Sequence, residues 1–412
     1  MAKRFIIINS HKYDITEFKH PGGNVINYMT NGENATEVFN EFHYRSKSAH
    51  RILNTLPKTK LTNFDYDDKE ILRDFNELRN TFIRKGYFTP SYFHVFTRFG
   101  TLLALYLGAS YMIPYNCLYA ALLFGLCGGQ CGWLQHEAGH NSLTGIIKVD
   151  KLIQEFIMGF GLYVSASKWN RMHNRHHATP QKIEHDVDLE TTPFVAFYKN
   201  AVTDNKAMTR FCSPLWLRFQ AYTFLPITSG LLVPIYWRCY LHTTHMIRNG
   251  KYREIFWTLL GTTAHIGAFM QLGELTLGKA FLYHYLSCWI SYIYMFGHFS
   301  LSHSTTDIVG KEENPSWIRY AIEHSVDIST RNYLVGWVMG YLNYQVIHHL
   351  FPSMPQYRGY EVSRELVPFC EKYGIEYKRI GYRRAWYEMF ANLDCVGKHN
   401  VYKHNVCKRR RD

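Results

Sequence analysis

The sequence predicts a mainly α-helical integral membrane protein with four membrane-crossing helices and a small α+β domain at the N-terminus. Long apolar runs fill the middle of the chain, from about residue 96 to 134 and from 254 to 297, whereas both ends are polar. Three groups of histidines lie beside these runs. The net charge of +13 fits basic loops that face the cytosol and anionic lipid. A basic helix interleaved with aromatic residues would indicate nucleic-acid binding, and the sequence shows no such helix.

The first 57 residues contain two candidate ligands for a flat cofactor. KRFIII at residues 3–8 predicts a short strand, and His20 opens the tetrapeptide HPGG, whose proline and glycines fix a tight turn. A second histidine, His43, lies 23 residues further on. The apolar residues between and beside them, which we expect to wall a pocket, are Val25, Ile26, Val38, Phe39 and Phe42.

Residues 3 to about 56 resemble a cytochrome b5 domain on these features, and we place the domain at residues 1–57. The resemblance implies haem b held between His20 and His43, a bis-histidine ligation that suits electron transfer and leaves no open site for oxygen. A linker follows at residues 58–92. Within it, Asp67 to Lys85 has apolar residues at helical spacing, an acidic start and a basic end. This helix either docks the haem domain on the membrane surface or is an ordinary packed helix.

The next segments predict a helical hairpin across the bilayer, at residues 96–113 and 115–134, with Pro114 between them. His136 and His140, in HEAGH, follow the second span directly. Residues 152–164 are apolar but too short to span, which predicts an interfacial helix. That helix leads into the second histidine group, HNRHH, on the same side of the membrane.

Three apolar segments, at residues 221–237, 254–272 and 279–297, separate the second histidine group from the third. An even number of crossings must separate them if all three groups are to meet at one site. The loop 238–253 carries four basic residues and should lie inside, so the segment 221–237, broken by two prolines, should lie in the interface. Four spans result. Residues 360–412 are expected to form a cytosolic cap that ends in a basic tail, Lys408 to Arg411.

The histidine groups predict a site for two metal ions. Residues three and four apart share one face of a helix, so HEAGH, HNRHH and QVIHH each direct several side chains at one spot. Seven histidines are too many for one tetrahedral zinc, and imidazole alone leaves iron, copper, nickel and zinc open. His303, in FSLSHST, is a further candidate; His298 competes for its role, and an exposed loop histidine is the alternative.

HEAGH, HNRHH and QVIHH, with the QxxHHLFPxMP context, resemble the three histidine boxes of membrane fatty acid desaturases, with the desaturase domain at residues 93–412. The fused haem domain and Gln345 resemble the front-end subgroup, which inserts a cis double bond between an existing one and the carboxyl end of a polyunsaturated acyl chain. The delta-5 and delta-6 enzymes are the favoured match. The resemblance implies O2 as co-substrate and a di-iron centre. Its expected ligands are His136, His140, His173, His176, His177, His303, Gln345, His348 and His349.

The resemblance also implies an acyl lipid or acyl-CoA substrate, an NADH-cytochrome b5 reductase as electron source, and the endoplasmic reticulum membrane, with the catalytic face and both termini cytosolic. Asp186 and Asp188 are either carboxylates that orient ligating imidazoles or plain surface acids. Many members have Asp where this chain has Glu137, and QIEHH where it has QVIHH, but neither change removes a ligand. A sphingoid-base delta-8 desaturase or an acyl hydroxylase would use the same site. HEAGH also matches the HExxH pattern of a membrane zinc protease.

Overall fold

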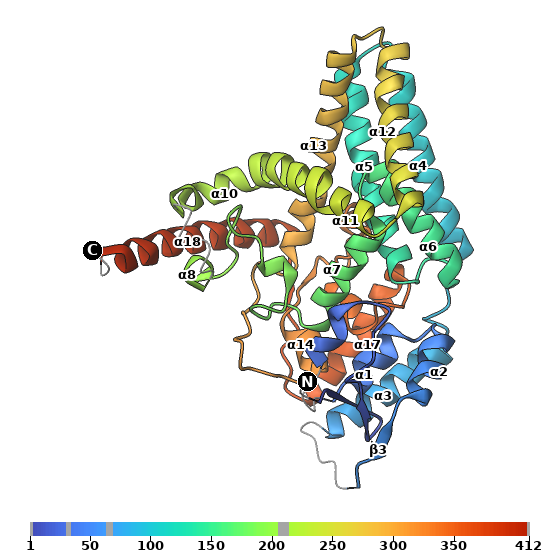
Figure 1. The fold of residues 1–412 in the computed structure, drawn as a ribbon, viewed down its shortest axis with the longest axis vertical. Helices are drawn as coiled ribbons and strands as arrows, with labels where there is room; N and C mark the ends of the chain where they lie inside the picture. Colours follow the sequence, from blue (N-terminus) through green and yellow to red (C-terminus); the bar gives the residue numbers. More distant parts are fainter. Residues whose placement is uncertain (1–2, 30–33, 63–68, 205–213, 410–412) are drawn as a thin grey trace.

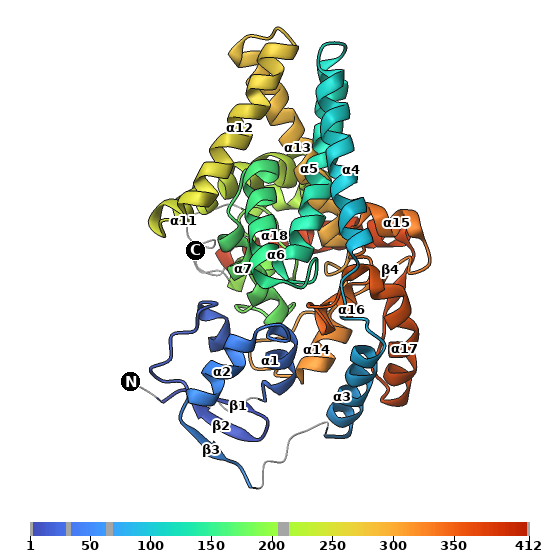
Figure 2. The same cartoon turned by 90° about the vertical axis from the view of Figure 1, so that its right-hand side faces the viewer.

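The computed structural model describes residues 3–29, 34–62, 69–204 and 214–409. Four long helices stand together at one end of the molecule, and the N-terminal domain lies at the other end, with shorter helices between them (Figures 1 and 2). Two predicted features, the acidic start of the connector at Asp67 and Asp68 and the side chains of the basic tail Lys408 to Arg411, lie outside the described residues.

The N-terminal domain is a small antiparallel sheet covered by short helices. Its strands, in the order β1-β2-β3, pair Phe5 with Asp14 and His11 with Lys60. The first strand buries Ile6, Ile7 and Ile8. The elements are β1 (Phe5–Ile8), β2 (His11–Asp14), η1 (Asn24–Met29), α1 (Thr36–Phe42), α2 (Lys47–Thr55) and β3 (Lys58–Lys60). The strand predicted at residues 3–8 is therefore confirmed.

The connector is helix α3 (Lys69–Arg84), and it packs on protein. Phe75 and Phe82 are fully buried, and both contact Phe351, just after the third histidine group, with ring centroids 5.4 and 5.5 Å apart. Lys85 beyond the helix also pairs with Glu365 at 2.6 Å. The packing that was one of its two predicted roles is therefore observed, and docking on the membrane surface stays a prediction. This packing fixes the N-terminal domain against the C-terminal part of the chain.

The long helices of the bundle are α4 (Tyr92–Met112), α5 (Cys117–Gly139), α12 (Tyr252–Leu272) and α13 (Leu277–Leu301). Glycines on α5 let it approach α13 closely. A Cβ atom at Gly129 would lie 1.7 Å from the ring of Tyr294, and one at Gly125 would lie 2.5 Å from Ile290. Such small residues are typical of tight helix packing in membranes. This contact sets the position of the first histidine group, at the end of α5.

Among the helices of the described residues, α5 is the one that is long and apolar enough, by length and composition, to cross a membrane. The other three long helices carry polar side chains that point inward, among them the buried Arg98, Glu254 and His284. These lower the mean hydropathy of helices whose outer faces stay apolar, as Phe93 and Leu282 show at 78% and 61% exposure. The four-span topology therefore stays a prediction.

The segment 221–237, predicted to lie in the interface, is part of a longer helical run, residues 220–248, that crosses the long helices at a steep angle (Figure 1). It comprises α10 (Gln220–Thr223), η5 (Phe224–Leu232), η6 (Ile235–His242) and α11 (Thr243–Arg248). The predicted interfacial helix before the second histidine group is α6 (Ile147–Phe156) with η2 (Ile157–Gly161), and α7 (Ala166–Ala178) follows.

The C-terminal part returns to the N-terminal domain before it ends in a long helix. Two-residue strands β4 and β5 pair in parallel, which ties the start of α18 to the loop after α14. The elements are α14 (Trp317–Glu323), β4 (Asp327–Ile328), α15 (Tyr333–Val338), α16 (Gln345–Leu350), η7 (Gln356–Arg358), α17 (Gly359–Lys372), β5 (Arg379–Ile380) and α18 (Tyr382–Arg409). Shorter pieces before them are η3 (Val187–Leu189), α8 (Ala201–Asp204) and η4 (Pro214–Phe219).

We expect Phe75→Ala to destabilise the packing of α3, because it removes a fully buried ring and leaves a cavity, which costs about 3–5 kcal/mol. The measurement is the apparent Tm of the detergent-solubilised protein, followed by size-exclusion chromatography after heating. Asn80→Ala, at an exposed position on the same helix, is the control and should leave the Tm unchanged. Equal Tm values for the two variants would contradict the packing role.

Candidate metal centre

The structure brings the three histidine groups to one place from three separate helices. His136 lies in the last turn of α5 and His140 caps it, α7 supplies His173 and His177, and α16 supplies His348. One ring nitrogen from each of these five side chains lies within 4.8 Å of the other four. The Nε2 atom of His177 lies 3.1 Å from that of His173 and 3.0 Å from that of His348. We call these five residues the first group.

A second group lies beside the first and consists of His176, His303 and His349, again with ring nitrogens within 4.8 Å. The amide nitrogen of Gln345 lies 3.1 Å from Nε2 of His303 and 3.2 Å from Nε2 of His349. The rings of His177 and His349 stack at 4.3 Å between the two groups. All nine side chains named from the sequence are therefore close together.

His303, and not His298, is the histidine that joins these groups. His303 is buried in a turn after α13, so it is not an exposed loop residue. Its Nδ1 contacts the carbonyl oxygen of His324 at 3.1 Å, and its Nε2 lies 3.2 Å from that of His349. Both ring nitrogens of His298 are engaged elsewhere, by the Tyr294 carbonyl and the Tyr382 hydroxyl.

Burial keeps most of these imidazoles neutral. Desolvation, followed by the charge of His176, lowers the pKa of His140 and that of His303 to about 3. Desolvation and neighbouring histidines likewise lower the pKa of His177 and His348. Burial alone would lower the pKa of His176 too, but the charges of Asp186 and Asp188 outweigh it and raise the value to about 9. Neutral imidazoles offer lone pairs, as a metal requires.

The unpaired atoms of the first group fit a metal. The Nε2 atoms of His136 and His140 are buried and have no hydrogen-bond partner. Buried polar atoms are paired in the great majority of native structures, so such orphans need a partner of another kind. Several nitrogen lone pairs that converge on one point suit a divalent transition metal. The second group, with fewer imidazoles and an amide, offers a similar donor set for a second ion.

Hydrogen-bond partners at the Nδ1 side of the imidazoles orient the rings. Both carboxylate oxygens of Asp186 lie 3.0 Å from Nδ1 of His176, and this buried carboxylate holds the proton there and leaves Nε2 free for a metal. Asp188, 3.3 Å from the same nitrogen, is half exposed. The amide nitrogen of Gln356 lies 2.6 Å from Nδ1 of His136. Rotation of this amide by 180° would place its oxygen there, where it would accept the Nδ1 proton and leave Nε2 of His136 free.

Sequence reasoning missed two residues that contact the HEAGH motif, Gln356 and His94. Gln356 follows the third histidine group directly in PSMPQ, and the glutamine could have been read as part of that motif. His94 lies 3.0 Å from Glu137 through its Nε2, and nothing in its local sequence signals that contact. The other oxygen of Glu137 accepts the backbone N–H of Gln356 at 3.2 Å.

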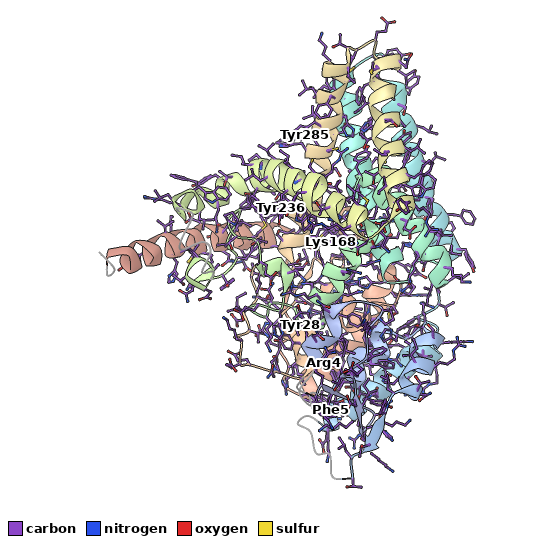
Figure 3. All side chains as sticks on the ribbon, in the orientation of Figure 1. Arg4, Phe5, Tyr28, Lys168, Tyr236 and Tyr285 are labelled. Carbon is purple, nitrogen blue, oxygen red and sulfur yellow. The ribbon has the colours of Figure 1, made fainter. Side chains whose placement is uncertain are left out.

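A cavity of about 720 Å³ opens beside the two groups. His173, His176, His303 and Gln345 line it on one side. Figure 3 labels three other lining residues, Tyr28, Lys168 and Tyr236, which come from η1, α7 and η6. Its apolar lining includes Met158, Leu162, Met295, Phe296 and Phe299, and its basic lining includes Lys168, Arg171 and Arg175. Asp188 and Glu190 line it too, and Arg175 pairs with Glu190 at 2.6 Å. With Lys168 and Arg171 on its wall, the cavity suits an apolar molecule with one polar, negatively charged end.

The two histidines of the N-terminal domain face each other. The ring centroids of His20 and His43 lie 6.0 Å apart, so these two imidazoles would hold one haem iron between them. The N–H of Gly22 points at Nδ1 of His20 at 3.1 Å, so the turn after the histidine orients the ring. Burial, then the charges of His20 and His50, lowers the pKa of His43 to about 4. Both rings are thus suited to bind haem iron as neutral imidazoles.

The N-terminal domain contacts the metal-binding region directly. The ring of Phe42, next to His43 in the sequence, meets the ring of His177 edge to face at 6.2 Å. Arg45 donates to the carbonyl oxygens of Phe88 and Ser353, and the Ser353 hydroxyl donates to the carbonyl of Glu41 at 2.8 Å. The domain is therefore held on the histidine groups by several specific contacts.

Comparisons with known proteins agree with these two parts. Residues 113–381 match the fatty acid desaturase family, and residues 2–62 match the cytochrome b5-like haem/steroid binding domain. The chain is 36% identical to an acyl-lipid (8-3)-desaturase of Thraustochytrium sp, over 97% of this chain and 93% of the relative. An enzyme of the same name from Rebecca salina is also 36% identical, over 96% and 92%. An acyl-lipid (9-3)-desaturase of Physcomitrium patens is 26% identical, over 91% and 72%.

We expect Asp186→Asn to weaken metal binding by about 10- to 100-fold, because the amide holds the His176 ring less firmly than the carboxylate. The measurement is metal content by mass spectrometry after dialysis against graded chelator. His298→Ala is the matched control, since that histidine lies outside both groups. If both variants keep the wild-type metal content at every chelator concentration, Asp186 does not support the site.

Proposed function

This chain belongs to the fatty acid desaturase family and is an oxidoreductase of that kind, and we propose that it is a front-end desaturase. It inserts a cis double bond between an existing double bond and the carboxyl end of a polyunsaturated acyl chain, at the delta-5 or delta-6 position. The observation that carries the proposal is the convergence of eight histidines into two adjoining groups beside a long cavity. The (8-3)-desaturase names of the two 36% relatives support it.

Two iron ions fit the two groups. The first group would hold one, and His176, His303, His349 and Gln345 would hold the other. With O2, the metal pair supplies the oxidising power to remove two hydrogens from adjacent methylene carbons, which no amino-acid side chain can supply. The reaction takes one O2, two electrons and two protons for each double bond and yields two molecules of water.

The chain's own residues place the substrate. Lys168 and Arg171 line the cavity near His173, and they suit the carboxyl or phosphate end of an acyl lipid. Leu162 and Met295 line its apolar part and exclude water from the methylene chain. Lys168 and Arg171 precede His173 on α7, and all three line the cavity. The acyl carbons near the metals should therefore be those near the carboxyl end. This arrangement supports the front-end assignment.

Electrons reach the metals through the fused haem domain in this proposal. A haem held by His20 and His43 would supply electrons one at a time, and an NADH-dependent reductase would be its electron source. The contact between Phe42 and His177 lies between the proposed haem ligand His43 and the first group. The packed contact between these two aromatic rings shortens the through-space distance that an electron would have to cross.

The four long helices would cross the membrane of the endoplasmic reticulum, with the histidine groups on the cytosolic side. Their exposed apolar side chains support this placement, since residues such as Phe96, Leu107, Leu259 and Phe281 are more than half exposed. The buried polar side chains inside the bundle fit the same arrangement.

A membrane zinc protease is the weakest alternative. Its mechanism needs the glutamate of HEAGH as a free base, but both oxygens of Glu137 are engaged, by His94 and by the backbone of Gln356. Glu137→Gln should therefore leave metal binding intact. A sphingoid-base delta-8 desaturase or an acyl hydroxylase would use the same groups, so product analysis decides between them.

Expression in a yeast host that makes no polyunsaturated fatty acids, with eighteen- and twenty-carbon polyenes fed singly, should yield a new double bond on the carboxyl side of an existing one. Gas chromatography with mass spectrometry of derivatised lipids gives its position. His176→Ala should abolish the product, because it removes a proposed ligand of the second ion. Unchanged acyl profiles from protein that contains haem and iron would instead indicate a sphingoid base or hydroxylation.

We expect Phe42→Leu to slow the reoxidation of reduced haem by O2 and substrate several-fold, because it removes the aromatic contact with His177. Stopped-flow absorbance of the haem follows this step directly, and haem content, iron content and haem potential should stay at wild-type values. Tyr44→Leu is the matched control. Tyr44 flanks His43 on its other side but contacts Phe88, with ring centroids 4.6 Å apart. Equal reoxidation rates in the two variants would exclude a special role for Phe42.

A further inference from the structure

A second cluster of polar side chains lies inside the bundle of long helices, away from the histidine groups. Arg238 of η6 donates to Nε2 of His284 at 3.0 Å and to the Thr262 hydroxyl at 2.8 Å. The Nδ1 atom of His284 lies 2.9 Å from Nδ1 of His265, which also contacts the Tyr163 hydroxyl at 2.7 Å. Ionisable side chains buried in a membrane helix bundle mark a functional site by default.

The arginine fixes the hydrogen positions along this chain of contacts. A guanidinium can only donate, so Nε2 of His284 is an acceptor and its proton is on Nδ1. That proton points at Nδ1 of His265, which is then an acceptor in turn. The proton of His265 is therefore on Nε2, and this buried N–H has no hydrogen-bond partner.

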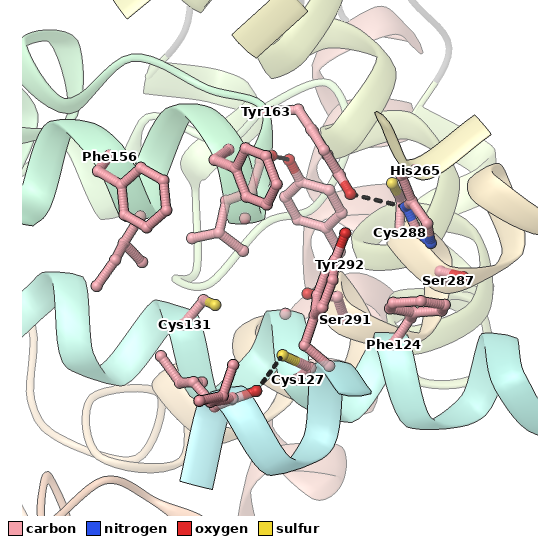
Figure 4. Close-up of a pocket in the computed structure, with 18 of the residues that line it drawn as sticks. Phe124, Cys127, Cys131, Phe156, Tyr163, His265, Ser287, Cys288, Ser291 and Tyr292 are labelled. Carbon is pink, nitrogen blue, oxygen red and sulfur yellow. Dashed lines mark hydrogen bonds between the residues drawn. The ribbon is translucent and has the colours of Figure 1, made fainter. Parts of the chain in front are cut away.

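His265 lines an apolar cavity of about 250 Å³ between the long helices (Figure 4). Ser291 lines the same cavity, and its buried hydroxyl also has no partner. The other lining residues are mostly aliphatic or aromatic, such as Leu102, Phe124 and Phe160. Two unpaired donors on the wall of an otherwise apolar cavity indicate a ligand that is apolar yet offers weak acceptors.

The cavity adjoins the one at the metal centre. Leu162 and Tyr292 line both cavities, and the Tyr292 hydroxyl donates to the Leu162 carbonyl at 3.2 Å. Phe124, which lines the smaller cavity, and His136 both belong to α5. They are separated by about 18 Å along the helix axis. An acyl chain whose carboxyl-side carbons lie at the metals would extend its methyl end past Leu162 and Tyr292 into this space.

We propose that this cavity binds the methyl-side part of the acyl chain and that His265 and Ser291 recognise the double bonds already present there. The inference rests on the proposed function and defines its substrate class. A double bond offers its π electrons to an N–H or O–H donor, a weak interaction that a saturated segment cannot make. A saturated chain therefore leaves both buried donors unpaired, so the site favours chains with methyl-side double bonds.

The test is competition between two twenty-carbon acids that share the double bond nearest the carboxyl end and differ only in their methyl-side double bonds. Equal amounts are fed to cells that express each variant, and the ratio of the two products is measured. His265→Phe and Ser291→Ala should each reduce the preference for the more unsaturated acid, by roughly two- to fivefold. Ser291→Ala is the independent variant, since it removes only an unpaired hydroxyl and leaves the network of His265 intact.

Ser287→Ala is the matched control. Ser287 lines the same cavity, but its hydroxyl already donates to the Tyr283 carbonyl at 2.8 Å, so the product ratio should stay at the wild-type value. A wild-type ratio in both His265→Phe and Ser291→Ala would overturn the proposal, because the donors would then not contact the chain. A wild-type protein that desaturates neither acid would overturn the proposed function together with it, and the two failures are thus distinguishable.

Discussion

The buried convergence of eight imidazoles is the constraint on which the rest of the structure depends. Neutral imidazoles packed with their lone pairs toward common points repel one another and leave nitrogens such as Nε2 of His140 unpaired, unless a cation binds among them. Each helix that carries a ligand must therefore be held by contacts elsewhere. The close packing of α5 on α13 through Gly129 holds the helix of HEAGH in place. The packing of α3 on Phe351 does the same for the helix of QVIHH.

The same requirement explains the bundle of long helices. Helices that hold polar groups inside and meet an apolar surrounding outside must turn their polar side chains inward, as Arg98 and Glu254 do. Glu254 accepts from Ser165 and from the backbone N–H of Ser167, at the start of α7, so a buried carboxylate in one long helix positions the helix of the second histidine group. Buried polar side chains thus position the histidines of the metal site as well as packing inside the bundle.

The parts that sequence predicted were those set by local spacing. The i, i+4 positions of His173 and His177 decide that these two share one helix face, and both lie in the first group. The partners of Glu137 and His136 come from residues far apart in sequence, His94 and Gln356, and spacing carries no information about them. Mean hydropathy averages over a helix and cannot tell an inward polar face from an outward apolar one, so the four-span topology stays a prediction.

The fused haem domain shows how packing changes the meaning of a linker. A flexible tether would raise the local concentration of the electron donor without fixing its orientation. Here α3 is packed over its length, with Phe75 and Phe82 buried, and Arg45 and Ser353 join the domain to the segment after α16. The domain is therefore held in one orientation, with Phe42 against His177. In the proposed electron transfer, the contact between the two parts, and not the length of the linker, would set the rate at which an electron passes.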